Sequence, residues 1–411
     1  MGEENDNAVE DLRMPCSALD AKFHPQAPSH LMLGLVDGSF SVYNLERRTE
    51  PVHSIRSLVP SGLRVVSVTV DGKYAVCGAS DGTFCTIDID SGGVRDLKKI
   101  KRKSGDDIGI TAIASIGSNP NVMVVGEDEG MVGLKGEESL SFRPQQANPL
   151  DLFSTNVYPS FQVRLWDMRS SSFVLKRHEH LDYVSDISEL GHGLKSVLTS
   201  SADGCLGVWD LRMSSSTSNS NGSPGLKVST MSGGVDDELL SLSVVKGGRK
   251  VVCGSSDGHL NIFSRADWSD LTDRFPGHPH SVDAIVKVDE DTIFTGSSDG
   301  MIRVIQLQPN KFLGLAGKHG DLPIERLSLS CDQRVLASCS HDDVIKFHDV
   351  ADFYHESDDT AQEPGQSETG EEIKCSHSDS HVREPLPLEP RRSRKKKKKT
   401  TVHDPAFFSG I

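Results

Sequence analysis

The sequence predicts an all-β protein that forms one seven-bladed β-propeller, followed by a disordered C-terminal tail. Seven segments share one pattern, in which an apolar run leads to a turn with Asp and then to an alternating strand. The turn aspartates are separated by 44, 47, 75, 54, 42 and 43 residues, and four of these spacings lie near the ~40–45 residues of a four-stranded blade. These aspartates are Asp37, Asp81, Asp128, Asp203, Asp257, Asp299 and Asp342.

The N-terminal segment, residues 1–14, is acidic and lacks the apolar stretch of a signal peptide. We expect "VEDLRM" within it to supply the outer strand that closes the last blade, and residues 15–353 to form the propeller. No run approaches the ~20 apolar residues of a membrane span. None of the eight cysteines are spaced C-x-x-C, which favours reduced, buried thiols over a zinc ribbon or a disulfide framework. We therefore expect a soluble, intracellular protein.

Each repeat has the pattern of an antiparallel meander. In "RVLASCSHDDVIKFHDV", Val335, Ala337 and Cys339 fall on one face, and Ile345 and Phe347 return on the same side after the turn. One such sheet cannot bury both faces, whereas seven stacked radially can, and closure of the ring protects most sheet edges.

Two insertions explain the two long spacings. The segment 133–163 lacks strand and helix periodicity, and removing its 31 residues from the 75-residue spacing leaves 75 − 31 = 44. We expect a loop between two strands of one blade, with a retained intron or alternative gene model left open. The Ser/Gly-rich segment 214–225 predicts a flexible surface loop.

The repeat that contains "SSADGCLGVWD" resembles the WD-repeat family through His180, Val184, Ile187, Ser200, Asp203, Gly204, Trp209 and Asp210. The resemblance implies a buried hydrogen-bonded chain of a His, a Ser or Thr, the turn Asp and the Trp, which rigidifies a blade. The residues expected in such chains are His180, Ser200, Asp203, Trp209, His278, Asp299, His319 and Asp342. Five repeats replace the Trp, by Tyr43, Ile87, Phe263, Ile305 and His348. We expect packing to hold those blades more than the polar chain.

Longer stretches, among them "RHEHLDYVSDI", "VVCGSSDGHLNIF" and the terminal "DPAFFSGI", are similar to one subfamily of WD-repeat proteins. This resemblance implies a nuclear and nucleolar scaffold, tied to ribosomal RNA processing and ribosome biogenesis in some lineages and to Cullin-4 ubiquitin ligases in others.

The chain contains no nucleophile elbow, phosphate-binding glycine loop, zinc-protease motif or dinucleotide fingerprint, so we expect no enzyme activity and no cofactor. Five histidines could suggest a metal. We favour a structural role, because three of them occupy the His position at the start of a blade. The five are His178, His180, His278, His280 and His319.

Two strand endings have the form W-D-x-R, namely Trp166, Asp167 and Arg169, and Trp209, Asp210 and Arg212. In propeller receptors of Cullin-4 ligases this ending binds the damaged-DNA-binding adaptor. A guanidinium at the rim suits bidentate bonds to an acidic partner. The resemblance implies a substrate receptor whose partner contacts are these six residues, with Arg212 the stronger candidate. Pairing of each Arg with a neighbouring acid is the structural alternative.

The tail, residues 354–411, begins with an acidic, Pro- and Ser-containing stretch that predicts disorder. A basic run at 391–399 then favours nuclear targeting, with RNA phosphates as a second use. It consists of Arg391, Arg392, Arg394, Lys395, Lys396, Lys397, Lys398 and Lys399. The net charge of −15 disfavours a globally basic nucleic-acid binder. Phe407, Phe408 and Ile411 suggest an apolar anchor for a partner. We expect the protein in the nucleus and nucleolus, with a cytoplasmic fraction left open.

Overall fold

The structure is a computed structural model that describes residues 10–47, 50–101, 107–117, 119–128, 161–191, 196–211 and 227–353. The chain divides into two units, Met1–Glu356 and Ser357–Ile411, and the described fold belongs to the first. The segment 214–225, Arg212 and the whole tail with its basic run lie outside the described residues. No helix in the described ranges is long and apolar enough to span a membrane.

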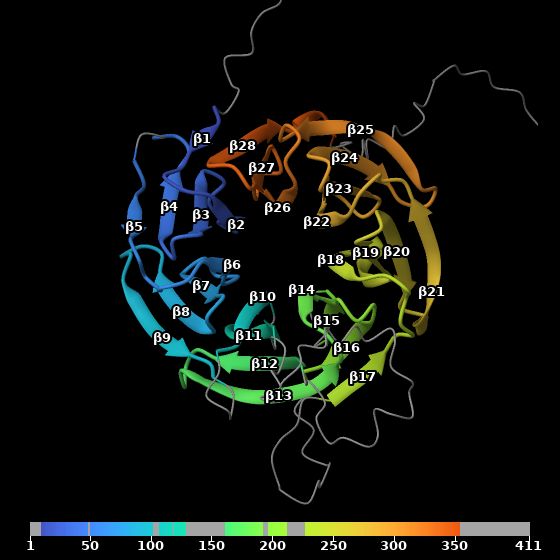
Figure 1. Cartoon of the computed structure of the whole chain (residues 1–411), viewed down its shortest axis with the longest axis horizontal. Helices are drawn as coiled ribbons and strands as arrows, with labels where there is room; N and C mark the ends of the chain where they lie inside the picture. The colour runs from blue at the N-terminus through green and yellow to red at the C-terminus, as the bar shows by residue number, and fades with distance from the viewer. Residues whose placement is uncertain are drawn as a thin grey trace, which may run out of the picture. The chain divides into compact units, whose positions relative to one another are not determined.

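Seven four-stranded antiparallel sheets form a closed ring around a central channel, which confirms the predicted seven-bladed propeller (Figure 1). Blade 1 consists of β2 (Ala18–Phe23), β3 (His30–Leu35), β4 (Phe40–Asn44) and β5 (His53–Ile55). Blade 2 consists of β6 (Leu63–Val68), β7 (Tyr74–Ala79), β8 (Thr83–Asp88) and β9 (Val94–Lys99). Blade 3 consists of β10 (Gly109–Ile116), β11 (Asn119–Asp128), β12 (Phe161–Asp167) and β13 (Ser172–His180). Blades 4 and 5 consist of β14 (Val184–Glu189), β15 (Ser196–Ser201), β16 (Leu206–Asp210) and β17 (Lys227–Met231); and β18 (Leu239–Val245), β19 (Lys250–Ser255), β20 (His259–Ser264) and β21 (Asp267–Pro276).

Blades 6 and 7 complete the ring. Blade 6 consists of β22 (Val282–Lys287), β23 (Thr292–Ser297), β24 (Met301–Gln306) and β25 (Lys311–Lys318). Blade 7 consists of β26 (Ile324–Leu329), β27 (Val335–Ser340), β28 (Val344–Asp349) and β1 (Leu12–Arg13). The described helices are two 3-10 turns, η2 (Lys246–Gly248) and η3 (Ala351–Phe353).

The N-terminal segment closes the ring at blade 7. Leu12 and Arg13 of β1 pair with Ile345 and Val344 of β28, so chain ends far apart in sequence share one sheet. The Met14 amide adds a bond of 2.7 Å to the Asp343 carbonyl oxygen. Closure within a single blade ties the first and last strands together, so the outer edge of β28 is paired.

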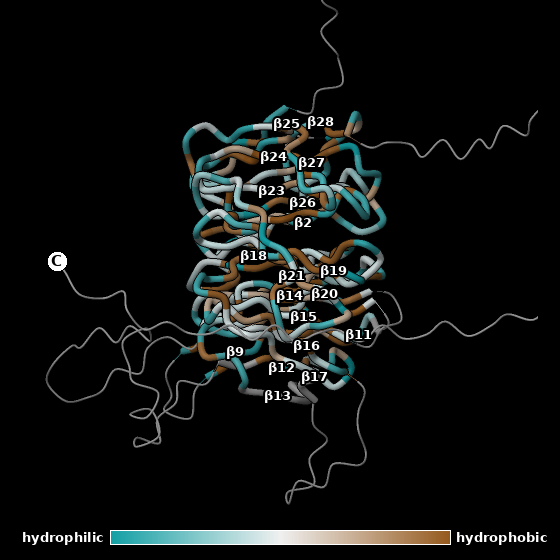
Figure 2. Tube along the Cα trace, turned by 90° about the vertical axis from the view of Figure 1, so that its right-hand side faces the viewer, coloured by the Kyte–Doolittle hydropathy of each residue, from teal (hydrophilic) through white to brown (hydrophobic). Residues whose placement is uncertain are grey.

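The hydrophobic core lies between neighbouring blades. One cluster joins Met32, Phe40 and Val42 of blade 1 to Cys77 and Ile87 of blade 2, and similar clusters follow around the ring. In Figure 2 hydrophobic residues follow the strands inside the ring, while hydrophilic residues gather in the loops on both faces. This arrangement buries both faces of each sheet, as a radial stack of meanders requires. The seven described cysteines are unpaired, and four are buried.

The predicted insertion extends too far at its C-terminal end. Residues Phe161 to Val163 belong to β12, where Val163 pairs with Gly126 and Phe161 with His180. The alternation of Phe161, Val163 and Leu165 continues the strand pattern, so the predicted boundary at 163 is wrong by three residues. The remainder of the insertion, 133–160, lies outside the described residues.

Candidate functional site

The seven turn aspartates lie on one face of the ring. In every blade the first strand lines the channel, and all seven first strands run along it in the same direction. The turns between second and third strands and the loops that lead into first strands therefore share one face. We call it the turn face and define it by Asp37, Asp81, Asp128, Asp203, Asp257, Asp299 and Asp342. The loops between first and second strands and between third and fourth strands form the opposite face.

Blade 4 contains a complete buried polar chain. The Trp209 indole N–H donates to the Thr199 hydroxyl at 2.8 Å, and Thr199 Oγ1 lies 2.7 Å from His180 Nε2. His180 Nδ1 donates to Asp203 Oδ2 at 3.1 Å. Burial acts to raise the pKa of Asp203, but the His180 hydrogen bond and backbone amides outweigh it and lower that pKa. Every polar atom of the chain has a partner, which is the condition for a stabilising buried network.

The hydroxyl in this chain is Thr199, so the prediction of Ser200 is wrong. Successive strand residues point to opposite faces, and a shift of one position turns the side chain away from His180. Ser200 instead bonds Ser185 at 2.8 Å. A signal was available in the sequence, since the corresponding hydroxyls of blades 6 and 7, Thr295 and Ser338, also stand four residues before the turn Asp.

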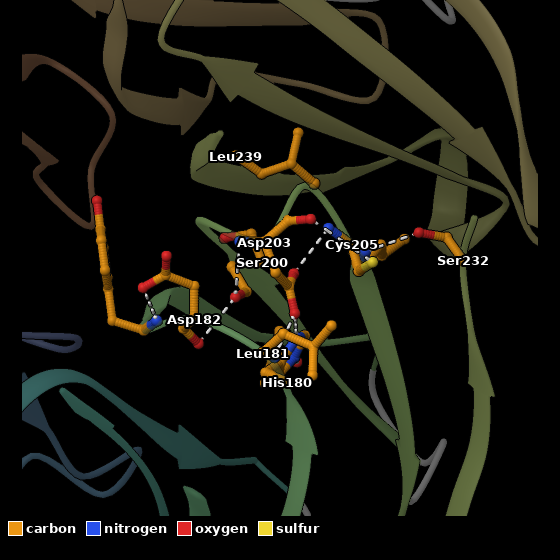
Figure 3. Close-up of polar contacts among 12 residues, drawn as sticks. His180, Leu181, Asp182, Ser200, Asp203, Cys205, Ser232 and Leu239 are labelled. Atoms are coloured by element: carbon orange, nitrogen blue, oxygen red, sulfur yellow. Dashed lines mark hydrogen bonds and ion pairs between the residues drawn. The ribbon is translucent and has the colours of Figure 1, made fainter. Parts of the chain in front are cut away.

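In Figure 3, Asp203 lies between His180 and Cys205, where it fixes two backbone segments at once. Its Oδ2 accepts the Leu181 amide at 2.8 Å, and its Oδ1 accepts the Cys205 amide at 2.9 Å. The side chain therefore ties the loop leading into blade 4 to the turn of the same blade.

Blade 7 preserves the chain with a His in the Trp position. His319 Nε2 donates to Asp342 at 2.9 Å, and His319 Nδ1 lies 3.1 Å from Ser338 Oγ. His348 Nε2 also reaches Ser338 Oγ at 3.1 Å. We expected packing to hold the blades without the Trp more than the polar chain does. Blade 7 nevertheless keeps such a chain, because an imidazole N–H can serve the hydroxyl as an indole N–H does.

Blade 6 has the same His and hydroxyl but breaks the chain at the Asp. His278 Nε2 lies 2.9 Å from Thr295 Oγ1, whereas His278 Nδ1 is buried without a partner among the described residues. Asp299 is occupied by Arg303, whose Nη1 and Nη2 donate at 3.0 and 2.5 Å. The predicted pairing of His278 with Asp299 is therefore absent, because a bidentate guanidinium binds the carboxylate more strongly than a neutral imidazole does.

The first W-D-x-R ending combines a buried Trp with an exposed Arg. Trp166 is fully buried and packs against Phe84 in a tilted arrangement, with 4.8 Å between ring centroids, and Lys98 Nζ lies 4.8 Å from the centroid of its ring. The Arg169 side chain is 65% exposed, and its Nε and Nη2 donate to the Asp167 carboxylate at 3.1 and 2.9 Å. This hydrogen bonding lowers the pKa of Asp167. Arg169 is thus both accessible and paired with its own strand ending.

The second W-D-x-R ending is described only in part. Trp209 is fully buried as the donor of the blade 4 chain, and Asp210 ends β16 opposite Ser196. Arg212 lies outside the described residues. Of the six predicted contact residues, Trp166 and Trp209 are therefore inaccessible to a partner. Asp167 and Asp210 are partly exposed, and Arg169 is exposed.

The central channel holds charged side chains that the backbone already uses. Asp20 Oδ2 accepts the Val66 amide at 2.7 Å, and Asp186 Oδ2 accepts the Leu242 amide at 3.0 Å, so each links one inner strand to the next. Arg326 also lines the channel cavity of about 130 Å³. Burial opposes its charge, yet the carboxylates of Asp20 and Asp186 raise its pKa. These residues stabilise the ring rather than form a reaction centre.

The turn face near blades 4 and 5 is acidic and carries an exposed leucine. Leu181 is 69% exposed, although its amide is held by Asp203. Burial and the neighbouring carboxylates raise the pKa of Asp182 and of Glu238. Burial also raises the pKa of Tyr183 to about 12, with Glu238 and Asp182 adding to the effect. Single exposed leucines are common on protein surfaces, so the group of neighbouring carboxylates is what distinguishes this part of the turn face.

Comparison with known proteins agrees with this geometry. Residues 269–306 match the model of the WD domain, G-beta repeat. The chain is 32% identical over 348 residues to WD repeat-containing protein JIP5 of Cryptococcus neoformans, covering 83% of this chain and 81% of that protein. It is 30% identical over 355 residues to a WD repeat-containing protein 55 homolog of Dictyostelium discoideum, covering 86% and 74%.

The human WD repeat-containing protein 55 is 28% identical over 345 residues, covering 83% of this chain and 76% of the human protein. Each of these matches covers more than four fifths of the chain. The chain therefore belongs to the WD-repeat family, in the group that contains WD repeat-containing protein 55 and its relative JIP5.

Proposed function

We propose that the protein is a non-enzymatic scaffold of the nucleus and nucleolus that assembles partner proteins in ribosome biogenesis and ribosomal RNA processing. The observation that carries the proposal is the exposed Leu181 on the turn face, beside Asp182 and Glu238. A partner that covers Leu181 removes apolar surface from water. Membership of the WD-repeat family supports a role in protein interaction.

The charge of this surface favours a basic partner. The pKa values of Asp182 and Glu238 are raised first by burial, which disfavours the charged carboxylate, and then by the other acids nearby. A Lys or Arg placed between them relieves this repulsion. Proteins that bind ribosomal RNA carry such basic segments, since they must neutralise phosphates. The turn face therefore suits a basic, partly apolar segment of a pre-ribosomal protein.

The basic run at 391–399 supports the nuclear part of the proposal from the sequence alone. Eight of its nine residues are Lys or Arg, which is typical of nuclear targeting signals and of sequence-independent phosphate contacts. Replacing Lys395 to Lys399 with Gln should shift a fluorescent fusion towards the cytoplasm. Nuclear retention equal to that of the parent chain would contradict the targeting role.

Affinity purification followed by mass spectrometry tests the scaffold role. The variant Asp182→Lys with Glu238→Lys reverses two charges on the turn face, and we expect it to lose large-subunit assembly factors from the recovered set. The matched control, Glu46→Lys with Asp90→Lys, makes the same charge change at two exposed acids in loops of the opposite face. Equal recovery by both variants would contradict the proposed docking face.

A second candidate is a substrate receptor that binds the damaged-DNA-binding adaptor of Cullin-4 ubiquitin ligases. The observation that favours it is the 65% exposed guanidinium of Arg169, which follows a buried Trp and an Asp at the end of β12. The same purification distinguishes the two functions, because adaptor and cullin peptides indicate the ligase and assembly factors indicate the ribosomal role.

A further inference from the structure

We propose that blade 5 carries a divalent transition-metal site formed by Asp237, Asp257 and His259. One carboxylate oxygen from each Asp and one imidazole nitrogen lie within 4.8 Å of one another. Asp237 belongs to the loop that leads into β18, Asp257 belongs to the turn before β20, and His259 is the first residue of β20. The site would thus join the same two segments that Asp203 joins in blade 4. The inference does not depend on the proposed scaffold function.

Blade 5 lacks the polar chain of blade 4. The backbone amide of Val235 bonds the Gly204 carbonyl, as those of His278 and His319 bond the preceding turn glycines, so Val235 stands in the His position. Register places Cys253 in the hydroxyl position and Phe263 in the Trp position. Val235, Cys253 and Phe263 therefore occupy three of the four positions of the chain. With Val235 in the His position, blade 5 has no hydrogen bond between a His there and the turn Asp.

The carboxylate of Asp257 is not used by its own turn. In the turns of five other blades the Asp carboxylate accepts the backbone amide two residues later, at 2.9 to 3.3 Å; these are Asp37, Asp81, Asp203, Asp299 and Asp342. In blade 5 the His259 amide donates instead to Ser255 Oγ at 3.2 Å. Among the described residues no hydrogen bond is made by the Asp257 carboxylate, which leaves its oxygens available as ligands.

The other two donors are held in place. Asp237 is 8% exposed, and its two oxygens accept the Ser256 hydroxyl at 2.5 Å and the Asp257 amide at 3.3 Å. His259 Nδ1 is buried and has no hydrogen-bond partner within the described part of the chain. Buried ring nitrogens are normally satisfied, so an orphan beside two carboxylates points to a missing partner. A cation that accepts electron pairs from all three side chains would satisfy this nitrogen and the two carboxylates together.

The donor set selects the kind of cation. Two carboxylate oxygens and one neutral imidazole suit Zn²⁺ or a similar first-row ion, whereas Ca²⁺ and Mg²⁺ prefer oxygen ligands alone. Three protein ligands leave a fourth tetrahedral position for water or for a donor from a partner. Because Asp257 is exposed on the turn face, that fourth position would be accessible from outside.

Zinc titration of the full chain, after removal of metals with a chelator, tests the site. Calorimetry should show one equivalent of Zn²⁺ that is weakened at least 10-fold in His259→Gln and in Asp257→Asn. The control His280→Gln removes an exposed imidazole of the same face that lies outside the cluster, and it should bind like the parent. Co²⁺ should give the visible absorption of a tetrahedral site, lost in both cluster variants.

Melting temperatures in chelator keep the test decisive. A fold defect in His259→Gln would lower its melting temperature in the absence of metal. In that case the zinc affinity of Asp257→Asn, whose substituted residue is exposed, tests the site instead. Zinc should raise the melting temperature of the parent and of His280→Gln but not of Asp257→Asn. Zinc binding by Asp257→Asn equal to that of the parent would overturn the proposal, and so would a parent that binds Ca²⁺ more tightly than Zn²⁺.

Discussion

Blades 4 and 6 contain the same His, hydroxyl and turn Asp, yet only blade 4 joins them. In blade 4 the His180 ring bridges Thr199 and Asp203, whereas in blade 6 the Asp299 carboxylate binds Arg303 and His278 Nδ1 has no described partner. One difference between the two blades lies in the third strand, at the residue that pairs with the hydroxyl. Thr199 pairs with Gly207, and Thr295 pairs with Arg303.

That position decides whether the His and the Asp can meet. A Cβ at Gly207 would lie 2.6 Å from Thr199 Oγ1, 2.9 Å from Trp209 Nε1 and 3.0 Å from His180 Nε2. Blade 4 therefore needs a glycine beside its indole. Blade 6 has the smaller Ile305 in the Trp position, so the position that corresponds to Gly207 can hold the Arg303 side chain. The Arg303 guanidinium then binds the Asp299 carboxylate. A repeat motif thus predicts a network only when the residue between its members is also known.

The largest effect should come from Trp209→Ala, which removes the donor and the largest packed ring of blade 4. We expect the free energy of unfolding to fall by about 3–5 kcal/mol, as for other large-to-small changes of buried aromatic residues. Urea denaturation measures it. Ile305→Val in blade 6 is the milder counterpart and should cost about 0.5–1.5 kcal/mol. Equal losses would show that the indole adds nothing beyond ordinary packing.

Gly207→Ala tests the position that separates the two blades. The new methyl group meets three members of the chain, so we expect a loss of about 1–3 kcal/mol from overpacking. Gly314→Ala in the outer strand β25 is the matched control, because a Cβ there meets nothing within 4 Å. If both variants unfold at the same urea concentration, steric exclusion is not the reason for the glycine in blade 4.

The sequence predicted the ring because its period depends on local chemistry. Each turn repeats at a near-constant spacing and each strand alternates, so seven blades followed without tertiary information. The Trp substitutions were also located correctly, since Tyr43, Ile87 and Phe263 occupy the register of Trp209. Ser200 was predicted in place of Thr199 because the motif does not say which of two adjacent strand residues faces the His. Adjacent strand residues point to opposite faces, so an error of one position selects the wrong side chain.

Contacts between different strands could not be predicted from one repeat. The capture of Asp299 by Arg303 depends on the space left by Ile305, and the use of His348 as a donor depends on its alignment with Ser338. The cluster at Asp237, Asp257 and His259 was missed for a related reason, because its members fall outside the His positions of the repeat. One signal was present, namely a His two residues after the turn Asp in a repeat without the usual His.

The orphan nitrogen of His278 predicts an acid-sensitive contribution to stability. Burial lowers the pKa of His278 to about 4, below its ordinary 6.5. Between these values the unfolded chain binds a proton that the folded chain does not, so the free energy of unfolding falls as the pH decreases from 6.5 to 4. One group contributes at most about 1.4 kcal/mol per pH unit. His278→Gln should flatten the measured dependence over this window, and an unchanged slope would contradict the assignment.

The smallest effect on folding is expected at the two W-D-x-R endings, where blades 3 and 4 place an Arg beyond a buried Trp. Within the described ranges the Arg169 side chain binds Asp167 of its own strand ending, and it is 65% exposed, so Arg169→Ala should change stability by no more than about 0.5 kcal/mol. Arg212→Ala should behave alike if it too lies at the surface. An anchor residue in a complex can nevertheless contribute about 2 kcal/mol to binding.

Melting temperature and adaptor pull-down of each variant and of the double variant separate the two roles. A double variant that melts like the parent but no longer recovers the adaptor would support the ligase function. One that keeps full binding leaves the arginines as partners of their own aspartates and favours the ribosomal scaffold.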